Sequence, residues 1–241
     1  MHRAINAISA SLYNTYRSAF LLRKSVATEE VGFNGQRHRK VLFRDLLEAC
    51  TFRAIIETGT FTGNTTAFMA RTAKVPVYTC ELSWRFSILA RIRLRGIPNV
   101  TFAVADSRAF LTQLCATGIA QSKRPFFYLD AHWHEDLPLE KELEIICNSW
   151  KDFVIMIDDF QVPGDNGYGY DSYGAEKILS LEDVFSRVFS KHDLVPFFPS
   201  VPSREETGFK RGCVVLARER DVVEILSGVP SLCKKELAYS G

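Results

Sequence analysis

The chain has 241 residues, of which 46% are hydrophobic and 24% are charged, and its formal net charge is +2. This length suffices for one α/β domain with a well-buried core, with at most an N-terminal appendage. The composition is ordinary for a soluble globular protein, and no segment approaches the roughly 20 consecutive apolar residues of a membrane span.

The six cysteines are scattered, without a C-x-x-C pair or the spacing of a zinc finger. Several stand in apolar runs, which indicates reduced cysteines buried in the core. Residues 1–24 contain no uninterrupted apolar region of the signal-peptide type. Together these features predict a cytoplasmic protein without a membrane partner.

The first elements in the chain are helical. Ile5, Ile8, Leu12 and Tyr16 recur at helical spacing and predict an amphipathic helix, which packs on the domain or a second subunit, or covers a binding pocket. Residues 27–36 are polar and predict a linker, and residues 39–50 predict a second helix. We therefore expect an appendage over residues 1–38 and a single domain over residues 39–241.

Residues 53–71, RAIIETGTFTGNTTAFMAR, are typical of a strand, a glycine loop and a helix. Such a loop brings a ligand close to the backbone and to the N-terminus of the following helix. The spacing Glu57-x-Gly59-x-x-x-Gly63 differs from the G-x-G-x-x-G of dinucleotide-binding folds. It suits a ligand with an amino acid portion, because Glu57 helps to receive an ammonium while loop amides face a carboxylate.

This motif resembles the first motif of the class I S-adenosylmethionine (SAM)-dependent methyltransferases. The resemblance implies that the loop binds SAM through Glu57, Thr58, Gly59, Thr60, Gly63, Asn64 and Thr65. An ordinary turn between a strand and a helix of another α/β protein is the alternative.

The next two predicted strands also end in acids. Residues 76–80 end at Glu81, 22 residues after Gly59, where doubly wound folds bind the ribose hydroxyls of a nucleotide. Residues 99–104 are followed by Asp106 and Ser107. The resemblance implies that Asp106 accepts from the adenine amino group, and the alternative is that it caps the helix over residues 107–117.

Three further acids follow the fourth and fifth predicted strands. Residues 125–129 end at Asp130, and residues 153–157 end at Asp158 and Asp159. Carboxylates that converge at one edge of a sheet repel one another unless a cation neutralises them. The three acids therefore predict a site for a hard divalent ion such as Mg²⁺.

This constellation resembles the metal-dependent O-methyltransferases, both the catechol-type enzymes and the tailoring enzymes that methylate macrolide sugars, with their cephalosporin-hydroxylase relatives. The resemblance covers about residues 40–217. The chain departs from those families after the fourth strand, since Trp133 stands where catechol-type enzymes carry a lysine base. His132 is the candidate base; it alternatively orients Asp130, which is itself a second candidate base.

Residues 160–174, FQVPGDNGYGYDSYG, predict an ordered loop over the site. Asp165 and Asp171 are expected in solvated turns, and the alternative is that they add ligands to the metal site. Residues 175–190 predict a helix, and residues 192–198 and 212–217 predict a closing antiparallel pair of strands. The side chains expected to contact a substrate are Trp133, Phe160, Tyr168 and Tyr170.

The resemblance implies a Rossmann-like α/β fold, with a mostly parallel seven-stranded sheet of order 3-2-1-4-5-7-6 and helices on both faces. It further implies Mg²⁺-dependent O-methylation of a small hydroxylated molecule, such as a natural-product or sugar intermediate, by an enzyme for which a homodimer is one expected assembly. The alternatives are a hydroxylase-like metal enzyme and a non-catalytic SAM-binding protein. A nucleic-acid acceptor is not expected, because the chain has no dense basic patch and no Asn-Pro-Pro-aromatic motif.

Overall fold

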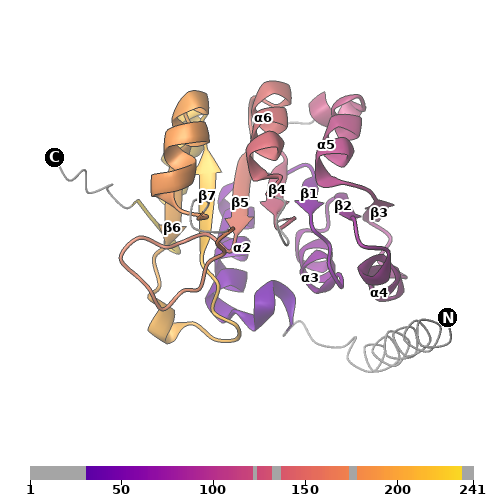
Figure 1. Ribbon diagram of the computed structural model, residues 1–241, viewed down its shortest axis with the longest axis horizontal. Coiled ribbons are helices and arrows are strands. Elements are labelled where there is room, and N and C mark those ends of the chain that lie inside the picture. The colour runs from indigo at the N-terminus through magenta and orange to yellow at the C-terminus, as the bar shows by residue number, and fades with distance from the viewer. Residues whose placement is uncertain (1–30, 122–123, 132–136, 174–177, 235–241) are drawn as a thin grey trace, which may run out of the picture.

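The computed structural model describes residues 31–121, 124–131, 137–173 and 178–234. These residues form one sheet with helices on both of its faces (Figure 1). No helix in these ranges has the length and apolar character needed to cross a membrane. The helix predicted around Ile5, Ile8, Leu12 and Tyr16 lies outside the described residues.

The sheet has eight strands in the order β3-β2-β1-β4-β5-β7-β6-β8. The first five are parallel, and β7 runs antiparallel to β5 and β6. The predicted order of seven strands is confirmed; the eighth is a two-residue addition that pairs with β6, too short to leave a pattern in the sequence. The strands are β1 (Ile55–Thr58), β2 (Val77–Glu81), β3 (Val100–Val104), β4 (Phe126–Leu129), β5 (Val154–Asp158), β6 (Val195–Pro199), β7 (Cys213–Ala217) and β8 (Leu232–Cys233).

Two apolar clusters cover the two faces of the sheet. Helices α5, α6 and η3 pack over one face, and α2, α3 and α7 pack over the other. The helix predicted over residues 175–190 is described only in part, as a π-helix. The helices are η1 (Gly32–Gly35), α2 (Arg37–Ala49), α3 (Asn64–Ala73), α4 (Trp84–Leu94), α5 (Ser107–Cys115), η2 (Gly118–Gln121), α6 (Leu139–Ser149), η3 (Leu181–Phe189), η4 (Ser190–His192), η5 (Ser203–Glu205) and α7 (Arg220–Ser227).

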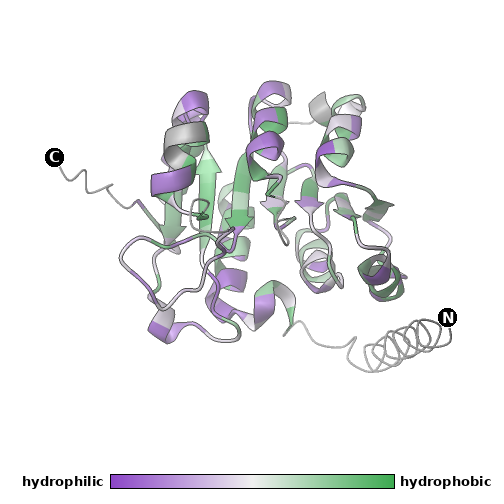
Figure 2. Ribbon diagram, viewed as in Figure 1, coloured by the Kyte–Doolittle hydropathy of each residue, from purple (hydrophilic) through white to green (hydrophobic). Residues whose placement is uncertain are grey.

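The central strands are buried on both faces, as strands of a parallel sheet must be when helices cover each side. Every residue of β1, β4, β5 and β7 is buried, and Figure 2 shows the hydrophobic colour concentrated on the strands. All six cysteines are free thiols, in agreement with the sequence-based interpretation.

The end of the predicted linker belongs to the domain. Phe33 is buried, and its ring lies 5.6 Å from the ring of Phe68 on α3 and 5.4 Å from that of Tyr128 on β4. The glycines on either side of Phe33 suggested a flexible connection. Burial of this aromatic ring instead fixes the chain immediately before α2.

A carboxylate from a distant part of the chain holds the start of α2. Glu206 accepts hydrogen bonds from the backbone N–H of His38 at 3.0 Å and from that of Arg39 at 3.1 Å. A negative charge is favourable at this end of a helix, where the N–H groups lack helical partners. The contact directs Arg39 toward the sheet, where its Nη1 lies 2.5 Å from Oδ1 of Asp158 at the end of β5.

The buried pair of Arg39 and Asp158 gives a first prediction. Arg39→Met leaves the carboxylate of Asp158 buried without its cation, so the free energy of unfolding should fall by about 3–5 kcal/mol. Urea denaturation measures this loss. Arg37→Met is the matched control, because Arg37 stands on the exposed side of the same helical turn and should change stability by less than about 0.5 kcal/mol.

Removing both charges should recover part of that stability. The double change Arg39→Met with Asp158→Asn no longer buries an unpaired charge, so it should unfold at a higher urea concentration than Arg39→Met alone. Equal midpoints for Arg39→Met and Arg37→Met would contradict the role given to this ion pair.

Candidate active site

A cavity of about 620 Å³ opens at the carboxyl ends of the parallel strands. It lies where the strand order reverses between β1 and β4, which is the usual ligand site of open α/β sheets. One end is lined by residues that follow β1, β2 and β3, among them Gly59, Glu81 and Asp106, and the other by residues that follow β4 and β5. Its volume is in the range of small-molecule sites.

Gly59 allows the glycine loop to approach the neighbouring strand. Its φ of +83° lies in the left-handed region, and a Cβ at this position would stand 2.1 Å from the backbone oxygen of Asp130. The loop is held from the other side as well, because the N–H of Gly59 donates to the carbonyl of Cys80 at 3.1 Å. Only glycine adopts this φ and allows this close approach. Gly59 lines the cavity, and its contact with SAM stays a prediction.

Glu57 lies beneath the loop. The hydroxyls of Thr66 and Thr79 each donate to its Oε2 at 2.5 Å, and Glu57 is not among the described residues that line the cavity. Burial raises the pKa of Glu57 to about 7. The carboxyl thus ties β1 to α3 and β2, and the ammonium contact expected for it stays a prediction.

The remaining predicted loop residues also support the loop from within, and none belongs to the described cavity lining. Thr60 shares a hydrogen bond of 2.5 Å with Thr79. Thr65 accepts from the N–H of Phe33 at 3.1 Å, and Asn64 donates to Thr62 at 3.3 Å. Thr58 is fully buried at the end of β1, and Gly63 precedes α3 with a φ of +77°.

Two backbone amides orient Glu81 at the cavity wall, and its predicted ribose contact stays a prediction. Its Oε2 accepts from the N–H of Phe61 and its Oε1 from the N–H of Ser83, both at 2.7 Å. Burial raises the pKa of this carboxyl above its ordinary value. Each carboxylate oxygen has a second lone pair, so a side chain fixed by two backbone amides at the cavity wall remains able to accept from vicinal hydroxyls.

Asp106 caps α5, and Ser107 lies beside it in the cavity wall. The Oδ1 atom of Asp106 accepts from the N–H of Arg108 at 2.9 Å and from that of Ala109 at 3.3 Å. The side chain of Arg108 donates to the same carboxylate and lowers its pKa. The capping alternative is therefore confirmed, and the adenine contact of Asp106 stays a prediction.

An aromatic pair at the mouth of the cavity was missed by the sequence analysis. The rings of Phe61 and Phe86 lie 4.3 Å apart, and both line the cavity together with Leu82. Phe61 is 48% exposed although it stands in a tight glycine loop. A large apolar side chain in such a loop, where no core position is available to it, was the signal in the sequence.

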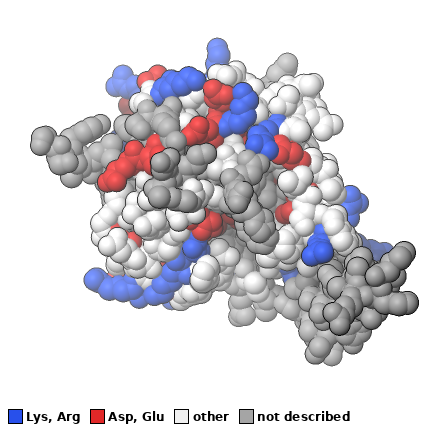
Figure 3. Space-filling view, viewed as in Figure 1, with Lys and Arg blue, Asp and Glu red and all other residues white. Residues whose placement is uncertain are grey.

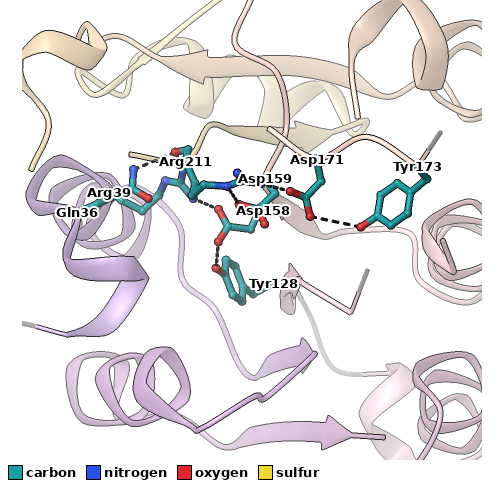
Figure 4. A network of polar contacts seen from close by, with 8 residues as sticks. All are labelled: Gln36, Arg39, Tyr128, Asp158, Asp159, Asp171, Tyr173 and Arg211. Carbon is teal, nitrogen blue, oxygen red and sulfur yellow. Dashed lines mark hydrogen bonds and ion pairs between the residues drawn. The ribbon is translucent and has the colours of Figure 1, made fainter. Parts of the chain in front are cut away.

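Asp158 faces the protein interior. Its Oδ1 accepts from Nη1 of Arg39 at 2.5 Å, and its Oδ2 accepts from the hydroxyl of Tyr128 at 2.6 Å (Figure 4). The side chain is 1% exposed and does not belong to the described cavity lining. Both carboxylate oxygens are thus engaged within the protein.

Asp159 lies in the cavity wall and is paired with an arginine. Its φ of +54° turns the chain sharply at the end of β5, a conformation that aspartate tolerates better than most residues. The Nε of Arg211 lies 2.5 Å from Oδ1 of Asp159, and its Nη2 contacts Oδ1 of Asp171. Asp171, which was assigned to a solvated turn, therefore lines the cavity beside Arg211 and Asp159.

The backbone of Arg211 is fixed from the side of α2. Its carbonyl accepts from Nε2 of Gln36 at 2.9 Å and from Nη2 of Arg39 at 2.5 Å (Figure 4). The two arginines and the aspartates they contact therefore form one polar network, which joins α2, the end of β5 and the segment before β7. The sequence showed no sign of this network, because its members lie up to 175 residues apart.

Asp130 lies at the centre of the acidic group. Burial raises its pKa well above the ordinary value, and the charges of Asp158, Asp159, Glu57 and Asp171 raise it further. The residue lines the cavity at the end of β4. A carboxylate with a raised pKa is a stronger base than an ordinary one.

The three-acid arrangement does not form a metal centre in the described part of the chain. No group of three or more His, Cys, Asp or Glu side chains there is placed to hold an ion. The donor set explains this, since both oxygens of Asp158 are occupied and Arg211 stands between Asp159 and Asp171. The candidate base His132 and the predicted substrate contact Trp133 lie outside the described residues.

The other predicted substrate contacts do not line the cavity in the described structure. Phe160 is fully buried and stacks on Phe189 at a ring distance of 6.0 Å. Tyr168 is also buried, and its hydroxyl donates to the carbonyl of Val201 at 3.0 Å. Tyr170 lies partly exposed outside the cavity, whereas Phe209 and Asn34 belong to its wall. The segment over residues 160–174 thus places the rings of Phe160 and Tyr168 in the core.

The raised pKa of Glu57 predicts a specific pH dependence of stability. Between the ordinary pKa of 4.5 and the folded-state pKa of about 7, the folded chain holds a proton that the unfolded chain has released. The free energy of unfolding should therefore fall as the pH rises through this window, by about 3 kcal/mol from this group. Glu57→Gln removes the titration, so urea denaturation at pH 4.5 and pH 8 should show a smaller decrease for this variant than for the wild type.

The control for this experiment is Glu48→Gln, at an exposed position on α2. It should retain the pH dependence of the wild type. If Glu57→Gln retains it too, the protonation of Glu57 is not linked to folding.

No protein-family model and no curated protein sequence matches the chain, whereas solved structures do. The O-methyltransferase from Bacillus cereus in complex with SAH superposes with a TM-score of 0.54 and 16% identity, over 87% of this chain and 91% of that chain. TomG from Streptomyces achromogenes, an O-methyltransferase involved in tomaymycin synthesis and solved with SAM, superposes with a TM-score of 0.54 and 16% identity, over 74% of this chain and 78% of that chain. At this level of identity the likeness concerns the fold, and the chain has the Rossmann-like fold of the class I SAM-dependent methyltransferases.

Proposed function

We propose that this chain is a SAM-dependent methyltransferase that methylates a hydroxyl group of a small molecule. The observation that carries the proposal is one cavity lined by Gly59, by the carboxylate of Glu81 that two backbone amides orient, and by Asp130, whose pKa is raised. The fold shared with SAM- and SAH-bound O-methyltransferases supports the same conclusion.

The residues that would hold SAM are those at the ends of β1, β2 and β3. Glu81 accepts from the ribose hydroxyls, and Phe61 and Phe86 offer apolar surface at the adenine end. Among the described lining residues, acids outnumber the single arginine, Arg211, which suits a cationic ligand. When bound, SAM supplies an electrophilic methyl group attached to a positively charged sulfur.

Asp130 is positioned to remove the proton of the acceptor hydroxyl. Asp130 lines the same cavity as Glu81, and its raised pKa favours proton uptake. The deprotonated acceptor oxygen forms a bond to the methyl carbon as the bond between that carbon and sulfur breaks. The protein's remaining contribution is alignment of the two reactants, worth up to about 7–11 kcal/mol when the geometry is good.

The proposed reaction uses no divalent metal. The Mg²⁺ site predicted from Asp130, Asp158 and Asp159 does not fit Asp158, because its side chain is 1% exposed, is paired with the guanidinium of Arg39 and does not belong to the described cavity lining. The end of the cavity lined by residues that follow β4 and β5, where the acceptor is proposed to bind, is called the acceptor end. Arg211 is the positively charged residue among its described lining residues.

The charge distribution supports a small-molecule acceptor. On the face drawn in Figure 3, acidic and basic side chains lie mixed along the upper part, and a small group of basic side chains lies at the lower left edge, away from that mixed region. A nucleic-acid site would gather positive charge along one face. The proposed acceptor is a natural-product or sugar intermediate with a free hydroxyl group, and the cavity volume of about 620 Å³ is in the range of small-molecule sites.

Glu81 provides the test of cofactor binding. Glu81→Ala removes the ribose acceptor, and isothermal titration with SAH should show an affinity about 30-fold weaker, equivalent to about 2 kcal/mol. The control Glu48→Ala replaces an exposed glutamate on α2 and should bind SAH like the wild type. If the wild type does not bind SAH, the proposed function is wrong.

A substitution of Asp130 tests whether this residue is the general base. In a screen of hydroxylated small molecules with SAM, release of SAH identifies an acceptor. With that acceptor, Asp130→Asn should lower kcat by at least about 100-fold, as expected for loss of a general base. Its affinity for SAH should stay within about threefold of the wild type. An unchanged kcat excludes Asp130 as the base, and SAH binding without turnover of any acceptor favours the non-catalytic alternative.

A further inference from the structure

The acceptor end of the cavity contains an arginine where the sequence predicted a divalent ion. We propose that Arg211 is a built-in replacement for that ion: its guanidinium group neutralises Asp159 and Asp171, and a divalent cation binds at this edge of the sheet only when Arg211 is removed. The exclusion of metal is independent of the proposed function, whereas the role of Arg211 toward an acceptor rests on it.

Asp159 and Asp171 both contact the guanidinium group of Arg211. Arg211 Nε lies 2.5 Å from Oδ1 of Asp159, and its Nη2 contacts Oδ1 of Asp171, so that one guanidinium group spans two carboxylates. The side chain of Arg211 is 14% exposed. The hydroxyl of Tyr173 approaches Oδ2 of Asp171 at 3.4 Å (Figure 4). An ion that approached these oxygens would meet a positive charge already bound to them.

The neighbouring acid is neutralised in the same manner. Asp158 is paired with Arg39, which is buried, and its second oxygen accepts from Tyr128. Asp158 and Asp159 are consecutive in sequence, yet each has its own arginine. The two acids at the end of β5 are therefore matched by two guanidinium groups, without a cation from solution.

The backbone around Arg211 explains why the guanidinium group stays in place. Its carbonyl is fixed by Gln36 and Arg39, as described above. The next residue, Gly212, donates to the carbonyl of Gly169 at 2.8 Å, and a Cβ at Gly212 would stand 2.1 Å from the carbonyl oxygen of Phe160. Both flanks of Arg211 are thus held against the segment that follows β5, from which Asp171 also comes.

This arrangement has a consequence for the acceptor. A guanidinium group remains charged at all physiological pH values, and its N–H donors have fixed directions. Arg211 therefore supplies the cavity with a permanent positive charge beside Asp159, suited to orienting an acceptor oxygen, and chelators do not remove it. Arg211 is in this sense a positioning residue for the acceptor.

The test is a titration of the full-length, SAH-loaded protein with Mn²⁺, followed by electron paramagnetic resonance of the free ion. The wild type should show no saturable site below about 1 mM. Arg211→Gln uncovers Asp159 and Asp171 next to Asp130, and it should gain one site that binds Mn²⁺ at least tenfold more tightly. Lys210→Gln is the matched control, because it removes the same charge from the adjacent residue outside the described cavity lining, and it should behave like the wild type.

Two further variants locate the gained site and guard against unfolding. Arg211→Gln combined with Asp159→Asn should lose the gained site again, and Arg211→Lys should keep Mn²⁺ out because it retains the charge. Circular dichroism and the melting temperature check that each variant is folded. If Arg211→Gln does not fold, Arg211→Lys and the wild type still decide the question.

A wild-type site that binds Mn²⁺ in the micromolar range and is abolished by Asp159→Asn overturns the proposal, and so does a folded Arg211→Gln variant that gains no site. Failure of the proposed function is seen separately, as absence of SAH binding by the wild type, and in that case the Mn²⁺ titration is made on the unliganded protein.

Discussion

The structure depends on offsetting the electrostatic repulsion among the acids that lie at one edge of the sheet. Asp130, Asp158 and Asp159 follow two adjacent parallel strands, and Asp171 returns to the same place. Like charges in a partly desolvated site are unfavourable unless they are paired or protonated. Arg39 and Arg211 pair with three of the acids, and burial together with the neighbouring charges raises the pKa of Asp130 well above its ordinary value.

The same charge pairing joins distant parts of the chain. Arg39 belongs to α2, which precedes the first strand, and Arg211 directly precedes the last long strand. Glu206 holds the start of α2, and the carbonyl of Arg211 accepts from the side chains of Arg39 on α2 and of Gln36, which immediately precedes this helix. The acceptor end of the cavity is thus built by three segments that no local interaction would bring together, and its geometry depends on the completed fold.

The two ends of the cavity are constructed differently. At the end formed by β1 and β2, backbone groups dominate: glycine allows close approach, and backbone amides orient Glu81. At the other end, charged side chains orient one another. This division matches the proposed chemistry, in which the cofactor is recognised by a fixed loop and the acceptor meets a base and a permanent cation.

The sequence by itself determined the fold and the residues Gly59, Glu81, Asp106 and Ser107 that line one end of the cavity. Strand-loop-helix units, Gly59 and Glu81 leave local patterns, because backbone approach and the position of an acid at a strand end are short-range properties. Only the tertiary structure decided the acceptor half. Arg39 decides whether Asp158 faces an ion or a guanidinium, and Arg211 decides whether Asp171 is a turn residue or part of the cavity wall. The contacts of these two arginines join residues that lie 40 to 172 positions apart. Spacing along the chain predicts which acids lie at an edge of the sheet, but it does not predict which cation pairs with them.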